Sequence, residues 1–145
     1  MRALVVVGAI AAVSAAAIAL WLVITNGQRR AQVTLGSRIY SDACASCHGA
    51  KLEGQPNWQT PLPSGRLPAP PHDATGHTWH HSDDDLFTIT RSGMAALVPG
   101  YASDMPIFAT LLADDEIRAA LAFIKDSWPA RERAFQAART ERHRE

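Results

Sequence analysis

Cys44-Ala45-Ser46-Cys47-His48 is the stretch of this chain that decides both its fold and its chemistry. A Cys-x-x-Cys-His sequence is typical of covalent haem attachment, because two thiols three positions apart can add to the two vinyl groups of one porphyrin. The histidine that follows can then reach the iron as its proximal ligand. Both cysteines of the chain lie within this pentapeptide. The sequence therefore predicts one covalently bound haem c, held by Cys44, Cys47 and His48.

Other uses of such a cysteine pair fit this chain less well. A thioredoxin-like redox pair needs a neighbouring βαβ pattern, which the sequence lacks. A zinc site would need further cysteines or a second histidine pair at metal-binding spacing. A chance pair or a local disulfide is the remaining structural alternative. Because the redox pair and the zinc site fit this chain less well than haem attachment does, we expect haem at Cys44–His48.

The chain before this motif contains a long apolar run. From Ala3 to Ile24 there is no charged residue. As a helix this run would be about 33 Å long, against about 30 Å of hydrocarbon in a bilayer. A cleaved signal peptide with a site at Ala15-Ala16-Ala17 is the alternative, but the apolar run continues well beyond that site. We expect residues 1–30 to form an uncleaved N-terminal transmembrane helix with a short linker.

Charge divides the remainder of the chain into two parts. Residues 31–129 hold six basic and eleven acidic side chains, so this expected domain is near −5 although the whole chain is neutral. Residues 130–145 hold five arginines and three glutamates and predict a charged tail, helical or flexible, with solvated side chains. The neutral total excludes a simple polybasic nucleic-acid binder, and we expect no nucleic-acid partner.

Two helices are predicted after the motif. Ser82 and Asp85 form the pattern of a capping box, and Gly93 is a plausible end for the helix that they begin. Three acidic residues, Asp114–Glu116, favour the start of a second helix through the helix dipole. The apolar residues of that helix recur at spacings of four, three and four and predict one buried face: Ile117, Leu121, Ile124 and Trp128.

The segment Gly36–Cys44 also carries a family pattern. Gly36 is followed by an aliphatic–aromatic pair ending in Tyr40, then by three residues and the first cysteine. Together with the haem motif, this arrangement resembles the class I cytochrome c family. The resemblance implies an all-α fold, a small helical domain around one covalent haem, here preceded by the transmembrane helix. It also implies that the helix face with Gly36 crosses the C-terminal helix.

Two methionines are candidates for the second axial ligand. Pro106 follows Met105 and favours an extended backbone there, from which a thioether can point into a pocket. The segment Asp104–Phe108 resembles the Met-Pro loop of the family. Met94 follows the expected helix end at Gly93 and could instead face the haem edge. We expect His48 and Met105 as axial ligands of the haem iron, with Met94 as the alternative to Met105.

Between the motif and the capping box lies a segment rich in proline and histidine. Six of the nine prolines fall between Pro56 and Pro71 and predict a rigid loop around a haem edge. The resemblance implies that one proline carbonyl here accepts a hydrogen bond from the haem histidine, without indicating which. We expect a surface loop with hydrogen bonds to haem propionates, and a copper or zinc site as the alternative, for His72, His77, His80 and His81. Trp58 and Trp79 are expected to pack on the haem.

These features together predict a membrane-tethered electron carrier, not an enzyme. The expected partners are redox protein donors and acceptors at the membrane. In bacteria the family's haem is attached outside the cytoplasmic membrane, so the resemblance implies a single-pass protein of that membrane with its haem domain on the periplasmic side. One alternative is a haem enzyme or gas sensor with an open sixth position and His77 or His81 as acid–base group. Another is a cytochrome subunit of a larger oxidoreductase or copper-handling complex.

Overall fold

The computed structural model describes residues 2–144, with side chains from Ser14 onward. The chain divides into two compact units, Met1–Gln32 and Val33–Glu145. Helices and loops make up the described residues, which contain no strand. The expectation of an all-α chain is confirmed.

Helix α1 (Arg2–Ala43) supplies the first unit and the beginning of the second. In the first unit the apolar side chains from Ile18 to Ile24 are exposed, with Trp21 at 63% and Val23 at 69%. Among the residues that the structure describes, no helix is both long and apolar enough to cross a membrane. The first half of the predicted span, before Ser14, lies outside the described side chains.

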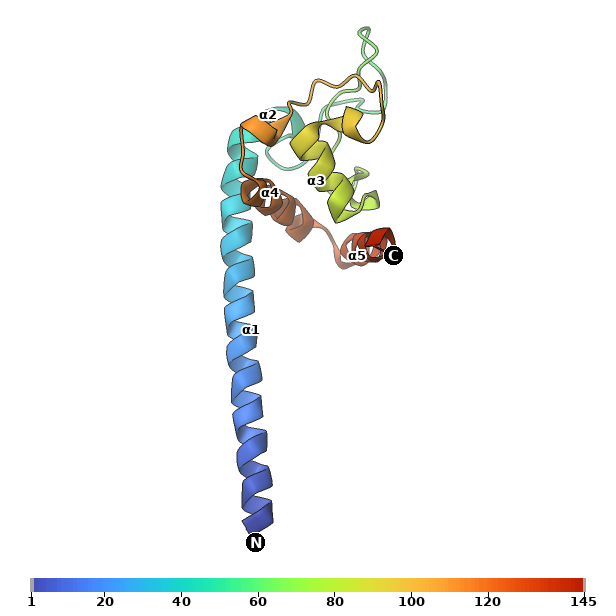
Figure 1. The fold of residues 1–145 in the computed structure, drawn as a ribbon. Helices are drawn as coiled ribbons and strands as arrows, with labels where there is room; N and C mark the ends of the chain where they lie inside the picture. The colour runs from blue at the N-terminus through green and yellow to red at the C-terminus, as the bar shows by residue number, and fades with distance from the viewer. Residues whose placement is uncertain (1, 145) are drawn as a thin grey trace. The chain divides into compact units, whose positions relative to one another are not determined.

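Within the second unit, helix α4 (Asp114–Ser127) crosses α1 at a glycine (Figure 1). A Cβ atom at Gly36 would lie 1.9 Å from the carbonyl oxygen of Ala119, so a larger residue could not occupy this position without moving the helices. Ile39 and Ala120 are buried in the same contact. The crossing implied by the family resemblance is therefore present.

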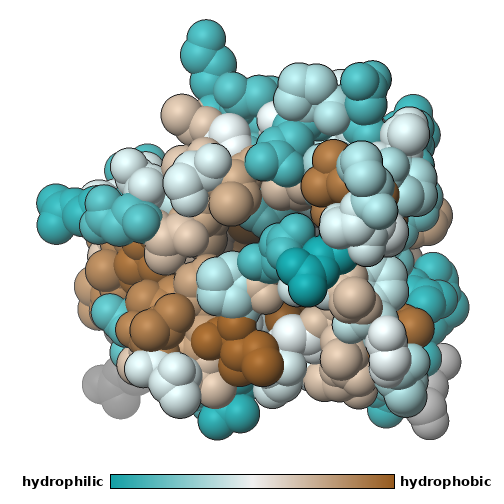
Figure 2. Space-filling model, turned by 90° about the horizontal axis from the view of Figure 1, so that it is seen from above, coloured by the Kyte–Doolittle hydropathy of each residue, from teal (hydrophilic) through white to brown (hydrophobic). Residues whose placement is uncertain are grey.

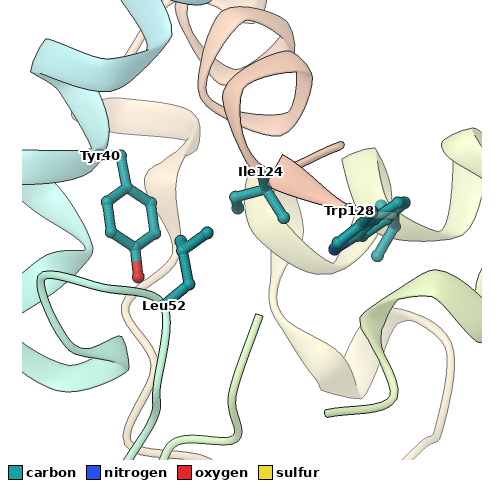
Figure 3. Close-up of a cluster of buried hydrophobic side chains, with 5 residues drawn as sticks. Tyr40, Leu52, Ile124 and Trp128 are labelled. Atoms are coloured by element: carbon teal, nitrogen blue, oxygen red, sulfur yellow. The ribbon is translucent and has the colours of Figure 1, made fainter. Parts of the chain in front are cut away.

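The main hydrophobic cluster joins α1, α4 and the loop after α2. Figure 3 shows Tyr40, Leu52 and Ile124 pointing toward one another, with Trp128 beyond Ile124. Tyr40 is 2% exposed and Trp128 is 1% exposed. Each large apolar side chain buried in this way contributes about 1.5–3 kcal/mol to folding. The predicted apolar face of α4 is confirmed at Ile117, Ile124 and Trp128, which are all buried.

Short helices connect these elements. They are α2 (Ala45–His48), the 3-10 helices η1 (Thr78–His80), η2 (Met94–Ala96) and η3 (Phe108–Thr110), and α3 (Asp83–Ser92). Ser82 and Asp85 form both hydrogen bonds of the predicted capping box at the start of α3. Gly93 ends α3 with a φ of 84°, a backbone conformation that favours glycine.

The tail forms helix α5 (Ala130–Arg144), and one of its faces is buried. Glu132, Gln136 and Thr140 are 7%, 1% and 5% exposed. Gln136 Nε2 donates to Asp83 Oδ1 at 2.7 Å, and the N–H of Asp83 donates to Thr140 Oγ1 at 3.0 Å. The expectation of a solvated tail is wrong for this face, because α5 buries these polar side chains against η1 and the start of α3.

Candidate cofactor-binding site

The Cys-x-x-Cys-His sequence forms a single helical turn directly after α1. The carbonyl of Cys44 accepts the N–H groups of Cys47 at 3.1 Å and His48 at 3.0 Å. Both cysteines carry free thiols, with Cys44 half-buried and Cys47 exposed. The turn therefore keeps two thiols and one imidazole close together along the chain.

The surroundings of Cys44 argue against a thiol redox centre. Burial, together with the neighbouring Cys47, raises the pKa of the Cys44 thiol to about 11. Cysteines that act in disulfide exchange show the opposite change, a lowered pKa that supplies thiolate at neutral pH. The Cys44 thiol stays protonated under those conditions.

His48 is held in one tautomer by the proline-rich loop. Its side chain is 7% exposed, and Nδ1 lies 2.8 Å from the carbonyl oxygen of Pro70. Because a carbonyl oxygen can only accept, Nδ1 carries the proton and Nε2 keeps its lone pair for a metal. Burial lowers the pKa of His48, and the hydrogen bond to Pro70 opposes that change only in part. The imidazole is therefore neutral, and Pro70 is the proline whose identity the sequence left open.

His72 lies flat against His48, which the sequence did not predict. The two ring centroids are 3.9 Å apart and the ring planes differ by 20°. His72 Nδ1 lies 2.8 Å from Thr78 Oγ1, and Trp128 Nε1 donates to the carbonyl of His72 at 2.7 Å. His72 lies in a loop, as expected, but it is only partly exposed and its ring packs on His48. No periodic pattern connects the two histidines, since they meet only through the path of the loop.

Close backbone crossings hold this loop in place. A Cβ atom at Gly54 would lie 2.4 Å from the nitrogen of Pro71, and one at Gly76 would lie 2.0 Å from its carbonyl oxygen. Leu52 has a φ of 69°, a left-handed conformation that is uncommon for a residue with a branched side chain. Its carbonyl accepts the N–H of His72 at 2.8 Å. These contacts keep the segment around Pro71 against the Cys-x-x-Cys-His turn.

The two candidate methionines lie in the segment between α3 and α4. Met94 begins η2, and Met105 lies in the loop before η3; both side chains are partly buried. The N–H of Met105 donates to Ser103 Oγ at 3.1 Å. Asp104, next to Met105, forms an exposed ion pair with Arg66 of the proline-rich loop.

The remaining loop histidines take part in aromatic contacts. His77 stacks on Trp58, with centroids 5.3 Å apart, and meets the ring of His81 edge-on at 5.5 Å. His80 lies 3.8 Å from Trp79 between ring centroids. Within the described part of the chain, no group of three or more His, Cys, Asp or Glu side chains could hold a metal ion.

Trp79 and the exposed apolar residues show how the site suits a large cofactor. The Nε1 of Trp79 is buried and has no hydrogen-bond partner. A donor in this state fits a ligand that carries acceptor oxygens. Apolar side chains are exposed on the loops between α2 and α4, among them Leu62 at 44%, Ile107 at 57% and Leu111 at 64%. Figure 2 views the molecule from the end that carries α2 and these loops in Figure 1, and shows apolar side chains exposed among polar ones.

The donor set, the tautomer of His48 and the apolar surroundings together fit a covalently attached haem. Residues 31–124 match the family model described as cytochrome c oxidase, cbb3-type, subunit III. The matched stretch is more than half of the chain and includes the Cys44–His48 turn, Pro70, Met94 and Met105. No curated protein and no solved structure matches this chain.

Proposed function

Because the chain belongs to the cytochrome c oxidase, cbb3-type, subunit III family, a family of c-type cytochromes, we propose that it is a single-haem electron carrier ligated by His48 and Met105. Cys44 and Cys47 would hold the haem through thioether bonds. When bound, the haem supplies a one-electron change between ferrous and ferric iron. The protein residues hold that haem, set its ligands and limit the access of water.

The observation that carries this proposal is the hydrogen bond between His48 Nδ1 and the Pro70 carbonyl, at 2.8 Å. Histidines that bind metals almost always donate their other ring N–H to a carbonyl or carboxylate, which sets the tautomer and makes the ligating nitrogen more basic. His48 has this partner and is 7% exposed. The chain thus prepares Nε2 as a ligand.

Met105 is supported by the loop in which it lies. Pro106 follows it, Ser103 accepts its N–H, and the ion pair between Asp104 and Arg66 ties the loop to the proline-rich segment. A thioether opposite a histidine raises the reduction potential relative to two histidines, which suits an electron carrier. Met94 is the alternative ligand from the same segment.

We propose that residues 1–30 tether residues 31–129, the cytochrome domain, to the bacterial cytoplasmic membrane, with the haem on the periplasmic side. The support is the uncharged run from Ala3 to Ile24 and the exposure of its described apolar side chains, 47–69% among the large ones. Exposing apolar surface to water costs about 25 cal/mol per Å², so lipid would stabilise this helix. Its partners would be redox proteins at that membrane.

A second candidate is a permanent subunit of a membrane oxidase. The family description, which names an oxidase subunit, favours it. In that case the electron donor or acceptor is a neighbouring subunit instead of a diffusing protein. Purification in mild detergent distinguishes the two, because a subunit remains with its complex whereas a carrier is recovered alone.

The ligation proposal is tested by visible spectra of the full-chain holoprotein, ferric and ferrous, in the wild type, Met105→Ala and Met94→Ala. We expect a low-spin wild type with a weak far-red sulfur-to-iron band. Met105→Ala should lose that band, gain a high-spin fraction and show a lower potential, whereas the matched Met94→Ala should keep the band. Loss in Met94→Ala alone would assign the ligand to Met94. A high-spin wild type that binds small ligands would overturn the proposal in favour of an open sixth position.

A further inference from the structure

His72 is the side chain that packs on the face of the proposed iron ligand. Its ring centroid lies 3.9 Å from that of His48, with the planes 20° apart. A hydrogen bond at Nδ1, together with the covalent bond from Cγ to Cβ, restrains rotation of the His48 ring about Cβ–Cγ. It leaves a smaller motion, the rocking of the ring plane about the line through those two ring atoms. A flat ring against the face of His48 restricts this second motion. Pro70 and His72 therefore constrain the imidazole in different ways, and both come from one short segment.

His72 is itself held by separate parts of the fold. Its N–H donates to the carbonyl of Leu52 at 2.8 Å, and its carbonyl accepts from Trp128 Nε1 at 2.7 Å. Its Nδ1 lies 2.8 Å from the hydroxyl of Thr78, which is 5% exposed. The backbone of His72 is therefore anchored to the loop after α2 and to the end of α4, and its ring is anchored to η1. These anchors restrict any turning of the His72 ring together with His48.

Helix α5 also supports the position of His72, through its contact with η1. Helix α5 packs against η1, and Phe135 of α5 meets Trp79 at 5.2 Å between ring centroids. Thr78, the partner of His72 Nδ1, lies at the start of the same 3-10 helix. The position of the His72 ring thus depends on the arrangement of the C-terminal helices as well as on the loop.

We propose that His72 is a positioning residue that sets the orientation of the His48 ring plane, and through it the electronic properties of the haem iron. The proposal rests on the proposed role of His48 as an axial ligand. It predicts that removing the His72 ring changes the iron's spectroscopic signature while haem attachment and Met105 ligation persist.

The test compares His72→Ala and His72→Phe with the control His143→Ala in the full-chain holoprotein. His143 is a suitable control because it is an exposed histidine near the end of α5. The readouts are the g values of the ferric low-spin iron in electron paramagnetic resonance, which depend on the orientation of the ligand plane, and the midpoint potential. We expect shifted, broadened g values and a shifted potential in His72→Ala. His72→Phe keeps a flat ring but loses the hydrogen bond to Thr78, so it should shift these values less than His72→Ala. His143→Ala should retain wild-type values.

Wild-type g values and potential in His72→Ala would overturn the proposal, as would an equal shift in His143→Ala. If His72→Ala does not mature with haem, Thr78→Val decides, since it keeps the ring and removes the Nδ1 partner. Broadened g values there support the proposal and unchanged ones contradict it. The far-red band reports Met105 separately. Its absence from the wild type would contradict the ligation proposal while leaving the His48 measurement interpretable.

Discussion

The His48 side and the Met105 side of the proposed haem site are built differently. On the His48 side, the carbonyl of Pro70 and the ring of His72, which belong to one segment of the loop, both contact His48, and the buried indole of Trp128 holds the backbone of His72. On the Met105 side, the ion pair that ties down the loop joins side chains that are 45% and 59% exposed.

The difference shows which side the polypeptide itself organises. Leaving a buried donor or acceptor unpaired costs about 1–3 kcal/mol, whereas an exposed ion pair contributes about 0–1 kcal/mol. Substitutions on the His48 side should therefore lower the stability of the fold. Substitutions on the Met105 side should alter the ligation of the iron before they alter the stability of the fold. The three predictions below test this contrast.

The largest effect is expected at Gly76, where the backbone passes Pro71. In Gly76→Ala the new Cβ would lie 2.0 Å from the Pro71 carbonyl oxygen, so the loop must move. We expect the free energy of unfolding of the full-chain holoprotein to fall by about 3 kcal/mol, measured by urea denaturation. Gly27→Ala is the control, because its Cβ meets nothing within 4 Å. Equal stability of the two variants would contradict the crowding of this loop.

An intermediate effect is expected from the contact that holds α5 behind η1. Burial raises the pKa of Asp83, but hydrogen bonds from Lys125 and Gln136 outweigh it and hold the pKa below the ordinary 3.8. A carboxyl group whose pKa is lowered by folding stabilises the fold at pH values above its pKa in the unfolded chain. This contribution is lost as the pH falls through the lowered pKa. Gln136→Ala should therefore cost about 1–2 kcal/mol above pH 4, and its difference from the wild type should shrink in acid.

Urea unfolding at several pH values checks this second prediction. The control is Glu141→Ala on the same helix, where the carboxylate is 75% exposed and lies 4.0 Å from Arg144. It should stay within about 0.5 kcal/mol of the wild type at every pH. A difference between Gln136→Ala and the wild type that is independent of pH would mean that Gln136 does not act through Asp83.

The smallest effect on stability is expected on the Met105 side. Arg66→Ala removes the ion pair with Asp104 and should lower the free energy of unfolding by no more than about 1 kcal/mol. It should nevertheless loosen the loop, so that the far-red sulfur-to-iron band disappears at a lower temperature than in the wild type. Arg91→Ala is the matched control, because its ion pair with Asp114 is similarly exposed, at 44% and 59%, and lies elsewhere. Identical melting of the band in both variants would contradict a role for Arg66.

Several features were predictable because they depend on residues close together in the sequence. The capping box of Ser82 and Asp85 was confirmed, as was the buried face of α4. The crossing at Gly36 followed from the family resemblance, and the structure shows Ala119 at that position. Local hydrogen bonds and helical periodicity carry the first two features, so the sequence alone suffices for them, whereas the crossing joins residues far apart in the chain.

The features that the sequence did not predict also share a physical cause. Helix α5 buries Gln136 and Thr140, polar residues whose partners lie on other elements, so hydrophobic periodicity could not predict its docking. The left-handed backbone of Leu52 has no signal in its residue type. Both depend on contacts between residues far apart in the chain.

The sequence by itself determined the cofactor chemistry, because two thiols and a histidine at Cys-x-x-Cys-His spacing need only one helical turn to act together. It also determined α3 and α4, since their caps and the apolar face of α4 are local patterns. Only the tertiary structure decided that Pro70, among six clustered prolines, meets His48 and that His72 packs on its ring. Those pairings depend on where a loop of irregular backbone crosses itself, which long-range packing determines and no local pattern encodes.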